Sequence, residues 1–104
     1  MKKVLIICNA GMSSSLMAKK ATDYLSEEGK DVKVEATTVA EGDKIIRDGS
    51  YDLYLISPQM RMHFKKLEST ANEVNKKISK IPFDAYSPTD FGVKKLVDII
   101  DENL

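Results

Sequence analysis

The chain has 104 residues, of which 42% are hydrophobic and 31% are charged, and 16 basic residues balance 16 acidic ones. This size suits one domain with a single core, so we expect one domain over residues 1–104. A net charge of zero gives no overall field that favours nucleic acid or an anionic membrane, and no apolar run approaches the ~20 residues of a membrane-spanning helix.

Short apolar runs alternate with helical patterns in the first half of the chain. Residues 4–7 are continuously apolar, which is typical of a central strand buried on both faces. Residues 17–25 repeat apolar side chains at helical spacing, residues 32–37 alternate as in a more exposed strand, and a short helix is expected over residues 41–47. Each helix is followed by a glycine, which suits a left-handed helix end: Gly29 and Gly49.

The second half repeats this order. Residues 53–56 form a second buried strand, and one apolar stripe then steps by four and three along a predicted helix. The residues of that stripe are Met60, Phe64, Leu67, Ala71, Val74 and Ile78. Residues 80–85 are expected to form the last strand, at a sheet edge because Pro82 cannot donate to a ladder. Ser87 to Asp90 resembles a capping box before a final helix with an apolar stripe over residues 93–104.

The predicted order βαβαβαβα indicates a parallel sheet with helices on both faces and right-handed crossovers. Continuous apolar strands belong in the middle, so the strand order should be 2-1-3-4. This is a doubly wound, flavodoxin-like α/β fold. Ligands of such sheets bind beyond the carboxyl ends of the strands at the topological switch point. Here that point lies between the first and third strands, where Cys8 and residues 57–59 emerge.

Cys8 is the only cysteine, and it ends the first strand where a loop of small and polar residues begins. Uncovered main-chain amides and a helix N-terminus stabilise both a thiolate and a bound phosphoryl group. We therefore predict that Cys8 is a nucleophile for phosphate chemistry. The predicted phosphate-binding residues are Asn9, Ala10, Gly11, Met12, Ser13, Ser14 and Ser15.

The sequence lacks the residues that nucleotide binding, metal binding and phosphate-ester hydrolysis by a cysteine phosphatase require. Nucleotide-binding glycine motifs are absent, and one Cys with one His at no close spacing predicts no metal site and no cofactor. A cysteine phosphatase needs an arginine six positions after its nucleophile, where this chain has Ser14. Such a site should hold a phosphoryl group without rapid hydrolysis, as a carrier does. A small cysteine-dependent phosphatase or arsenate reductase is the alternative, and a non-catalytic binding module with an inert cysteine is the third hypothesis.

Residues 8–16, Cys-Asn-Ala-Gly-Met-Ser-Ser-Ser-Leu, resemble the phosphorylation loop of IIB components in the lactose/cellobiose family of the bacterial sugar phosphotransferase system. Ser57-Pro58-Gln59 resembles a short segment of the same family, and the resemblance covers essentially the whole chain. It implies that a phosphohistidine of a IIA protein phosphorylates Cys8. The phosphocysteine then donates to a sugar entering through the membrane-embedded IIC component.

The resemblance leaves the sugar open among lactose, cellobiose, chitobiose and related β-glucosides. We expect a cytoplasmic protein, since one unpaired cysteine and no export signal suit a reducing compartment, and a monomer. Cys8 should be solvent-accessible on a shallow surface where both partners dock, with adaptable apolar contacts from Met12, Leu16 and Met62. Whether Pro58, Gln59, Arg61 or Asp90 contributes to the site stays open at this stage; Asp90 is better explained as a cap than as a general acid.

Overall fold

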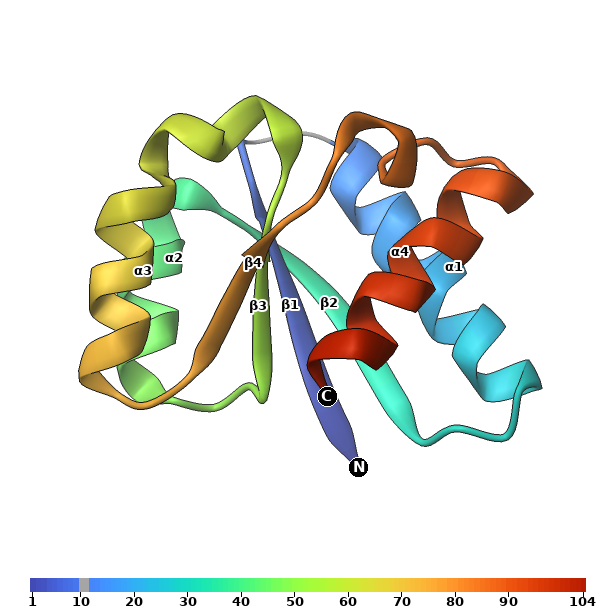
Figure 1. Cartoon of the computed structure of the whole chain (residues 1–104), viewed down its shortest axis with the longest axis horizontal. Coiled ribbons are helices and arrows are strands. Elements are labelled where there is room, and N and C mark those ends of the chain that lie inside the picture. The colour runs from blue at the N-terminus through green and yellow to red at the C-terminus, as the bar shows by residue number, and fades with distance from the viewer. Residues whose placement is uncertain (10–11) are drawn as a thin grey trace.

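Four parallel strands form one sheet in the order β2-β1-β3-β4, as predicted. β1 (Lys2–Cys8) pairs with β2 (Val32–Thr38) and with β3 (Leu53–Ile56), and β3 pairs with β4 (Lys77–Lys80). The computed structural model describes residues 1–9 and 12–104. The carboxyl ends of the strands meet at the upper edge of the sheet in Figure 1, and both chain termini lie toward the opposite edge.

Helices cover both faces of the sheet in pairs (Figure 1). α1 (Met12–Glu27) and α4 (Asp90–Asn103) pack on one face, whereas α2 (Val39–Asp48) and α3 (Phe64–Glu73) pack on the other. This arrangement confirms the doubly wound α/β fold. None of the helices within residues 1–9 and 12–104 is long and apolar enough to cross a bilayer.

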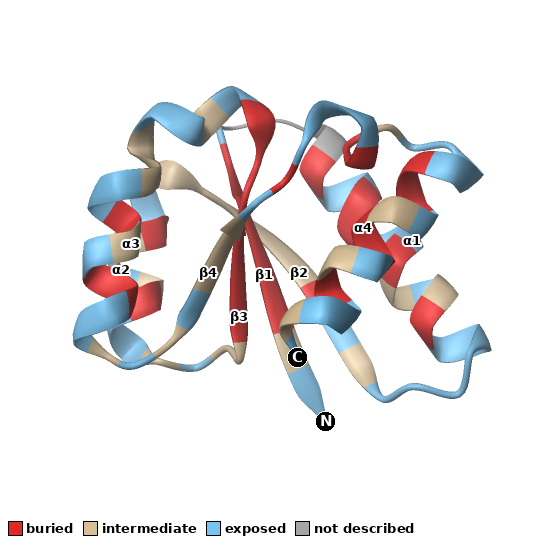
Figure 2. Cartoon of the chain, in the orientation of Figure 1, coloured by how far each residue is buried: buried red, intermediate tan, exposed pale blue. Residues whose placement is uncertain are grey.

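β1 is buried on both faces, which explains its unbroken apolar run. Val4, Ile6 and Cys8 belong to the core beneath α1 and α4, and Leu5 and Ile7 belong to the core beneath α2 and α3. Figure 2 shows β1 and β3 largely buried, whereas the outer strand β2 is mostly half-buried and β4 is half-buried or exposed. The alternation that builds both cores also sets the direction of the Cys8 side chain.

The first two helices end as the sequence predicts. Gly29, which follows α1, has φ of +77°, and Gly49, which follows α2, has φ of +66°. Both values lie in the left-handed region, where a residue without Cβ is least strained. The Gly49 N–H donates to the Ile46 carbonyl oxygen and so closes the last turn of α2.

The predicted single helix from Met60 to Ile78 is wrong at both ends. A 3-10 helix, η1 (Pro58–His63), precedes α3, and the chain leaves α3 through Asn75, which has φ of +57°. Ile78 already lies in β4. It packs against the same core as the α3 side chains, so the helical spacing of apolar residues continued by coincidence into a strand.

The last strand also differs from the prediction of residues 80–85. β4 ends at Lys80, and Ile81 still donates its N–H to the Ile56 carbonyl oxygen at 2.8 Å. Pro82 follows outside the strand and precedes η2 (Phe83–Ala85). β4 is an edge strand as expected, but the absence of a donor at Pro82 is not the reason.

The N-cap of α4 is Thr89 rather than Ser87. The Thr89 Oγ1 accepts a hydrogen bond from the Gly92 N–H at 3.2 Å, while Asp90 is the first helical residue. The predicted capping box is therefore shifted, with a hydroxyl cap two residues later than expected.

Candidate functional site

Cys8 is the last residue of β1, at the switch point of the sheet. It pairs with Thr38 of β2, and the Ser57 N–H donates to the Ile7 carbonyl oxygen at 2.9 Å, which continues the β1–β3 pairing to this level. The side chain is only 3% exposed. The expectation of an accessible thiol is therefore wrong, because alternation along β1 turns Cys8 with Val4 and Ile6 into the core beneath α1 and α4.

Two side chains hold the thiol. The Tyr86 hydroxyl donates to Cys8 Sγ at 3.2 Å, and the Sγ–H donates to Asn9 Oδ1 at 3.4 Å. Tyr86 lies 78 positions further along the chain, between η2 and α4. Tyr86 is not predicted from the sequence, because no local spacing connects it with Cys8.

Ser14, in the first turn of α1, joins this group from another side. Its side chain is 3% exposed and is hydrogen-bonded to Tyr86. Burial raises the pKa of the Tyr86 hydroxyl well above its ordinary value, the neighbouring Cys8 adds to this rise, and Ser14 acts in the opposite direction. The Tyr86 hydroxyl therefore stays protonated and acts as a donor.

The start of α1 provides a favourable electrostatic setting for an anion. The first turn contains no acidic residue, and the N-terminus of a helix carries a partial positive charge with free N–H groups. Beside it, a hollow of about 120 Å³ opens between α1 and the carboxyl end of β2. Its lining residues are Asn9, Ser14, Ser15, Ala36, Thr37 and Thr38.

Some of the predicted phosphate-binding residues lie near the thiol, and two lie outside the described part of the chain. Asn9 is exposed and contacts the thiol, Ser14 is buried beside Tyr86, and Ser15 is exposed on the hollow. Met12 and Ser13 contribute main chain to the first turn of α1. Ala10 and Gly11 lie outside the described residues, so their predicted role as phosphate ligands stays a prediction.

Other candidate residues lie in different hollows. Arg61 and the buried Pro58 line one of about 240 Å³ beside β4, and His63 lines one of about 210 Å³ beside α2 and α3. Gln59 is exposed in η1. Within residues 1–9 and 12–104, no group of three or more His, Cys, Asp or Glu side chains is arranged to hold a metal ion.

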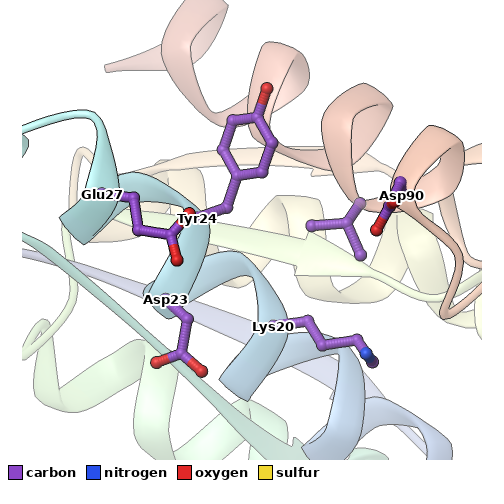
Figure 3. Close-up of a pocket in the computed structure, with 6 residues that line it drawn as sticks. Lys20, Asp23, Tyr24, Glu27 and Asp90 are labelled. Atoms are coloured by element: carbon purple, nitrogen blue, oxygen red, sulfur yellow. The ribbon is translucent and has the colours of Figure 1, made fainter.

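Asp90 borders a groove of about 270 Å³ between α1 and α4. Figure 3 shows Lys20, Asp23, Tyr24 and Glu27 of α1 lining this groove opposite Asp90. Three carboxylates make it a poor place for a phosphoryl group. Tyr86 and Asn9, which contact the Cys8 sulfur, are not carboxylates, so these contacts give Asp90 no role as a general acid.

A doubly wound sheet with its one cysteine at the switch point, beside a helix start without acidic residues, defines a class of small α/β proteins suited to anion chemistry on a thiol. The comparison with protein families is specific. The chain belongs to the lactose/cellobiose-specific IIB subunits of the PTS system, whose family model matches residues 3–98. These subunits are phosphotransferases, sugar-specific phosphoryl carriers that work with IIA and IIC components.

Curated relatives and solved structures agree. The chain is 31% identical to the oligo-beta-mannoside-specific EIIB component of Bacillus subtilis (strain 168), covering 86% of this chain and 85% of the relative. It is 33% identical to the galactose-specific EIIB component of Lactococcus lactis subsp. cremoris (strain MG1363), covering 90% and 85%. The lactose-specific IIB domain of Streptococcus pneumoniae superposes with a TM-score of 0.83 at 19% identity, covering 98% and 96%, and so shares the fold.

Proposed function

We propose that Cys8 is the phosphorylated residue of this IIB subunit. Its sulfur accepts a phosphoryl group from a phosphohistidine of the IIA component and donates it to a sugar presented by the IIC permease. The observation that carries this proposal is the position of the thiol at the carboxyl end of a central strand. There it lies next to the N-terminus of α1, where an anion is stabilised.

The transfer is a substitution at phosphorus. The thiol first loses its proton to solvent, the sulfur lone pair forms the S–P bond, and the electron pair of the N–P bond returns to the imidazole. Catalysis of such a step depends on positioning and on stabilisation of phosphoryl charge. We assign that role to Asn9 and to the main chain from Ala10 to Ser15.

Burial of the sulfur limits how the partners reach it. A donor must approach between the groups that cover Cys8, which include Asn9 and Tyr86. Leu16 and Met62 are 45% and 72% exposed, and we infer that they contribute apolar contacts to a docking surface shared in turn by the IIA and IIC components. The protein acts as a cytoplasmic monomer in this scheme.

The transported sugar is proposed only as a class. Relatives of similar identity are named for oligo-beta-mannoside, galactose and cellobiose. Three different names at 31–33% identity single out no one sugar for this chain. We propose a β-linked disaccharide such as cellobiose, chitobiose or lactose, selected by the permease.

The test is a phosphorylation assay with phosphoenolpyruvate, the general phosphotransferase proteins and a cognate IIA protein. Intact-mass analysis should show one added phosphoryl group on the wild type and none on Cys8→Ser. Addition of membranes with the IIC permease and its sugar should then remove the group. An unmodified wild type would overturn the proposal, and steady hydrolysis of p-nitrophenyl phosphate that needs Cys8 would favour a phosphatase instead.

A further inference from the structure

We propose that Tyr86 is a catalytic residue, whose hydroxyl donates a hydrogen bond to the attacking sulfur and then to the transferred phosphoryl group. The proposal rests on the phosphorylation of Cys8 proposed above. Its basis is the contact of 3.2 Å between the Tyr86 hydroxyl and Cys8 Sγ, inside the core and across 78 positions of sequence.

The choice of acceptor points to a role beyond stability. A neutral thiol sulfur is a weak acceptor, whereas a thiolate forms a charge-assisted hydrogen bond about twice as strong as a neutral one. Tyr86 is 9% exposed and Cys8 is 3% exposed, so the hydroxyl cannot readily replace this acceptor with water. The hydrogen bond therefore gains most when Cys8 is ionised, which is the form that attacks phosphorus.

Tyr86 acts as a donor and not as an acid or a base. Burial and the neighbouring Cys8 raise the pKa of its hydroxyl, so the proton stays on the oxygen through the reaction. The Ser14 side chain is hydrogen-bonded to Tyr86 as well. Ser14, Tyr86 and Cys8 thus form a connected polar group at the start of α1.

The same donor serves the product. Once the S–P bond forms, the sulfur has used one lone pair in that bond and no longer carries a negative charge, while the phosphoryl oxygens next to it are strong acceptors. A small movement of the hydroxyl from sulfur to a phosphoryl oxygen keeps the donor paired. Stabilisation is thereby available to the thiolate, to the transition state and to the phosphocysteine.

The fold holds the Tyr86 hydroxyl in place before the reaction. The Tyr86 N–H donates to the Phe83 carbonyl oxygen at 3.1 Å, and its ring belongs to the core beneath α1 and α4. On its other side, the Ser87 carbonyl lies so close to Gly92 that a Cβ there would clash with it. A donor whose ring is held in this way needs little reorganisation when charge develops.

The test compares Tyr86→Phe with Tyr54→Phe. Both substitutions remove one hydroxyl from a buried ring, but the Tyr54 hydroxyl donates to the Ile45 carbonyl oxygen at 3.3 Å beneath α2 and α3. Two measurements are made on each folded variant: the pH profile of Cys8 alkylation by iodoacetamide, and the rate of phosphorylation by the phosphorylated IIA protein.

For Tyr86→Phe, we expect the pH midpoint of alkylation to rise and phosphorylation to slow by about tenfold, since a hydrogen bond to a charged group is lost. The alkylation rate at the high-pH plateau should stay near the wild-type value because the ring still covers the sulfur. Tyr54→Phe should change neither quantity. An unchanged midpoint and rate in Tyr86→Phe would overturn the donor role, as would equal changes in both variants.

Alkylation requires no partner protein, so it separates the two proposals. A wild-type protein that accepts no phosphoryl group, although the midpoint still shifts in Tyr86→Phe, would overturn the carrier mechanism. A wild type that is phosphorylated normally, together with an unchanged Tyr86→Phe, would overturn only the role of Tyr86. A faster reaction in Tyr86→Phe would also overturn it, because Tyr86 would then be a cover that hinders access.

Discussion

The two faces of the sheet each bury a tyrosine, and the partners of the two hydroxyls differ. Beneath α2 and α3, the Tyr54 hydroxyl donates to the Ile45 carbonyl oxygen and accepts from the Tyr51 N–H. Beneath α1 and α4, the Tyr86 hydroxyl is hydrogen-bonded to the thiol of Cys8 and to the side chain of Ser14. Main-chain groups pair with the Tyr54 hydroxyl. The partners of the Tyr86 hydroxyl are side chains: a thiol that can lose its proton and a serine.

This difference separates a structural face from a functional one. A hydroxyl paired with the main chain contributes to stability, and the charge of its partner does not change. A hydroxyl paired with a thiol is held near a group whose charge changes during phosphoryl transfer. The α1/α4 face carries the reactive group because the even-numbered residues of β1 end in Cys8 on that side.

The largest expected effect contrasts two glycines. A Cβ at Gly92 would clash with the Ser87 main chain, whereas a Cβ at Gly42 would meet only the Ile7 side chain, 3.1 Å away at its nearest atom. We expect Gly92→Ala to lower the free energy of unfolding by about 3 kcal/mol and Gly42→Ala to change it by less than about 1 kcal/mol. Denaturant unfolding of both variants measures this, and similar losses would contradict the contrast.

The Gly92 substitution also tests how Tyr86 is held. Displacement of Ser87 should move the neighbouring Tyr86, so the pH midpoint of Cys8 alkylation should rise in Gly92→Ala and not in Gly42→Ala. A folded Gly92→Ala variant with a wild-type midpoint would show that the turn before α4 does not position the hydroxyl.

A smaller effect on stability is expected from two buried hydroxyls, one of which is hydrogen-bonded and one of which is not. Thr70 donates to Asp43 Oδ1 at 2.6 Å, whereas Ser57 Oγ, in a fully buried residue just after β3, has no hydrogen-bond partner among residues 1–9 and 12–104. Thr70→Val should destabilise the protein by about 1–2 kcal/mol. Ser57→Ala should be neutral or stabilising by up to about 1 kcal/mol, because it removes an unpaired polar atom. Thermal unfolding decides this, and a marked loss in Ser57→Ala would be the contrary result.

The sequence predicted the central part of the fold better than its edge. Residues 53–56 were predicted as a strand with the observed bounds, and the strand order follows from which apolar runs are continuous. The fourth strand was misplaced because Ile78 continues the helical spacing of α3 while it packs on the same core from a strand. Periodicity identifies which residues face the core, but a single apolar residue such as Ile78 fits the pattern of a helix and of a strand equally well.

The site was predicted in its local part only. A strand followed by Cys8 and a helix start can be recognised from neighbouring residues, and the structure places this thiol at the switch point. The contact with Tyr86 spans 78 positions, so no spacing rule indicates it. The sequence does contain a signal for the burial of the thiol: Val4, Ile6 and Cys8 share one side of β1, and alternation alone places Cys8 under a helix.

The smallest effect concerns alkaline pH and again compares the two faces. Burial, followed by the hydrogen bond to Glu35, raises the pKa of Tyr51 to about 12, and burial also raises the pKa of Tyr86. A folded-state pKa above the unfolded value contributes stability that is complete below the unfolded pKa of about 10 and is lost as pH rises through the folded pKa. The free energy of unfolding should therefore fall above about pH 10. Tyr51→Phe and Tyr86→Phe should each flatten that decline in urea unfolding series, and a decline that is equally steep in both variants would assign it to other groups.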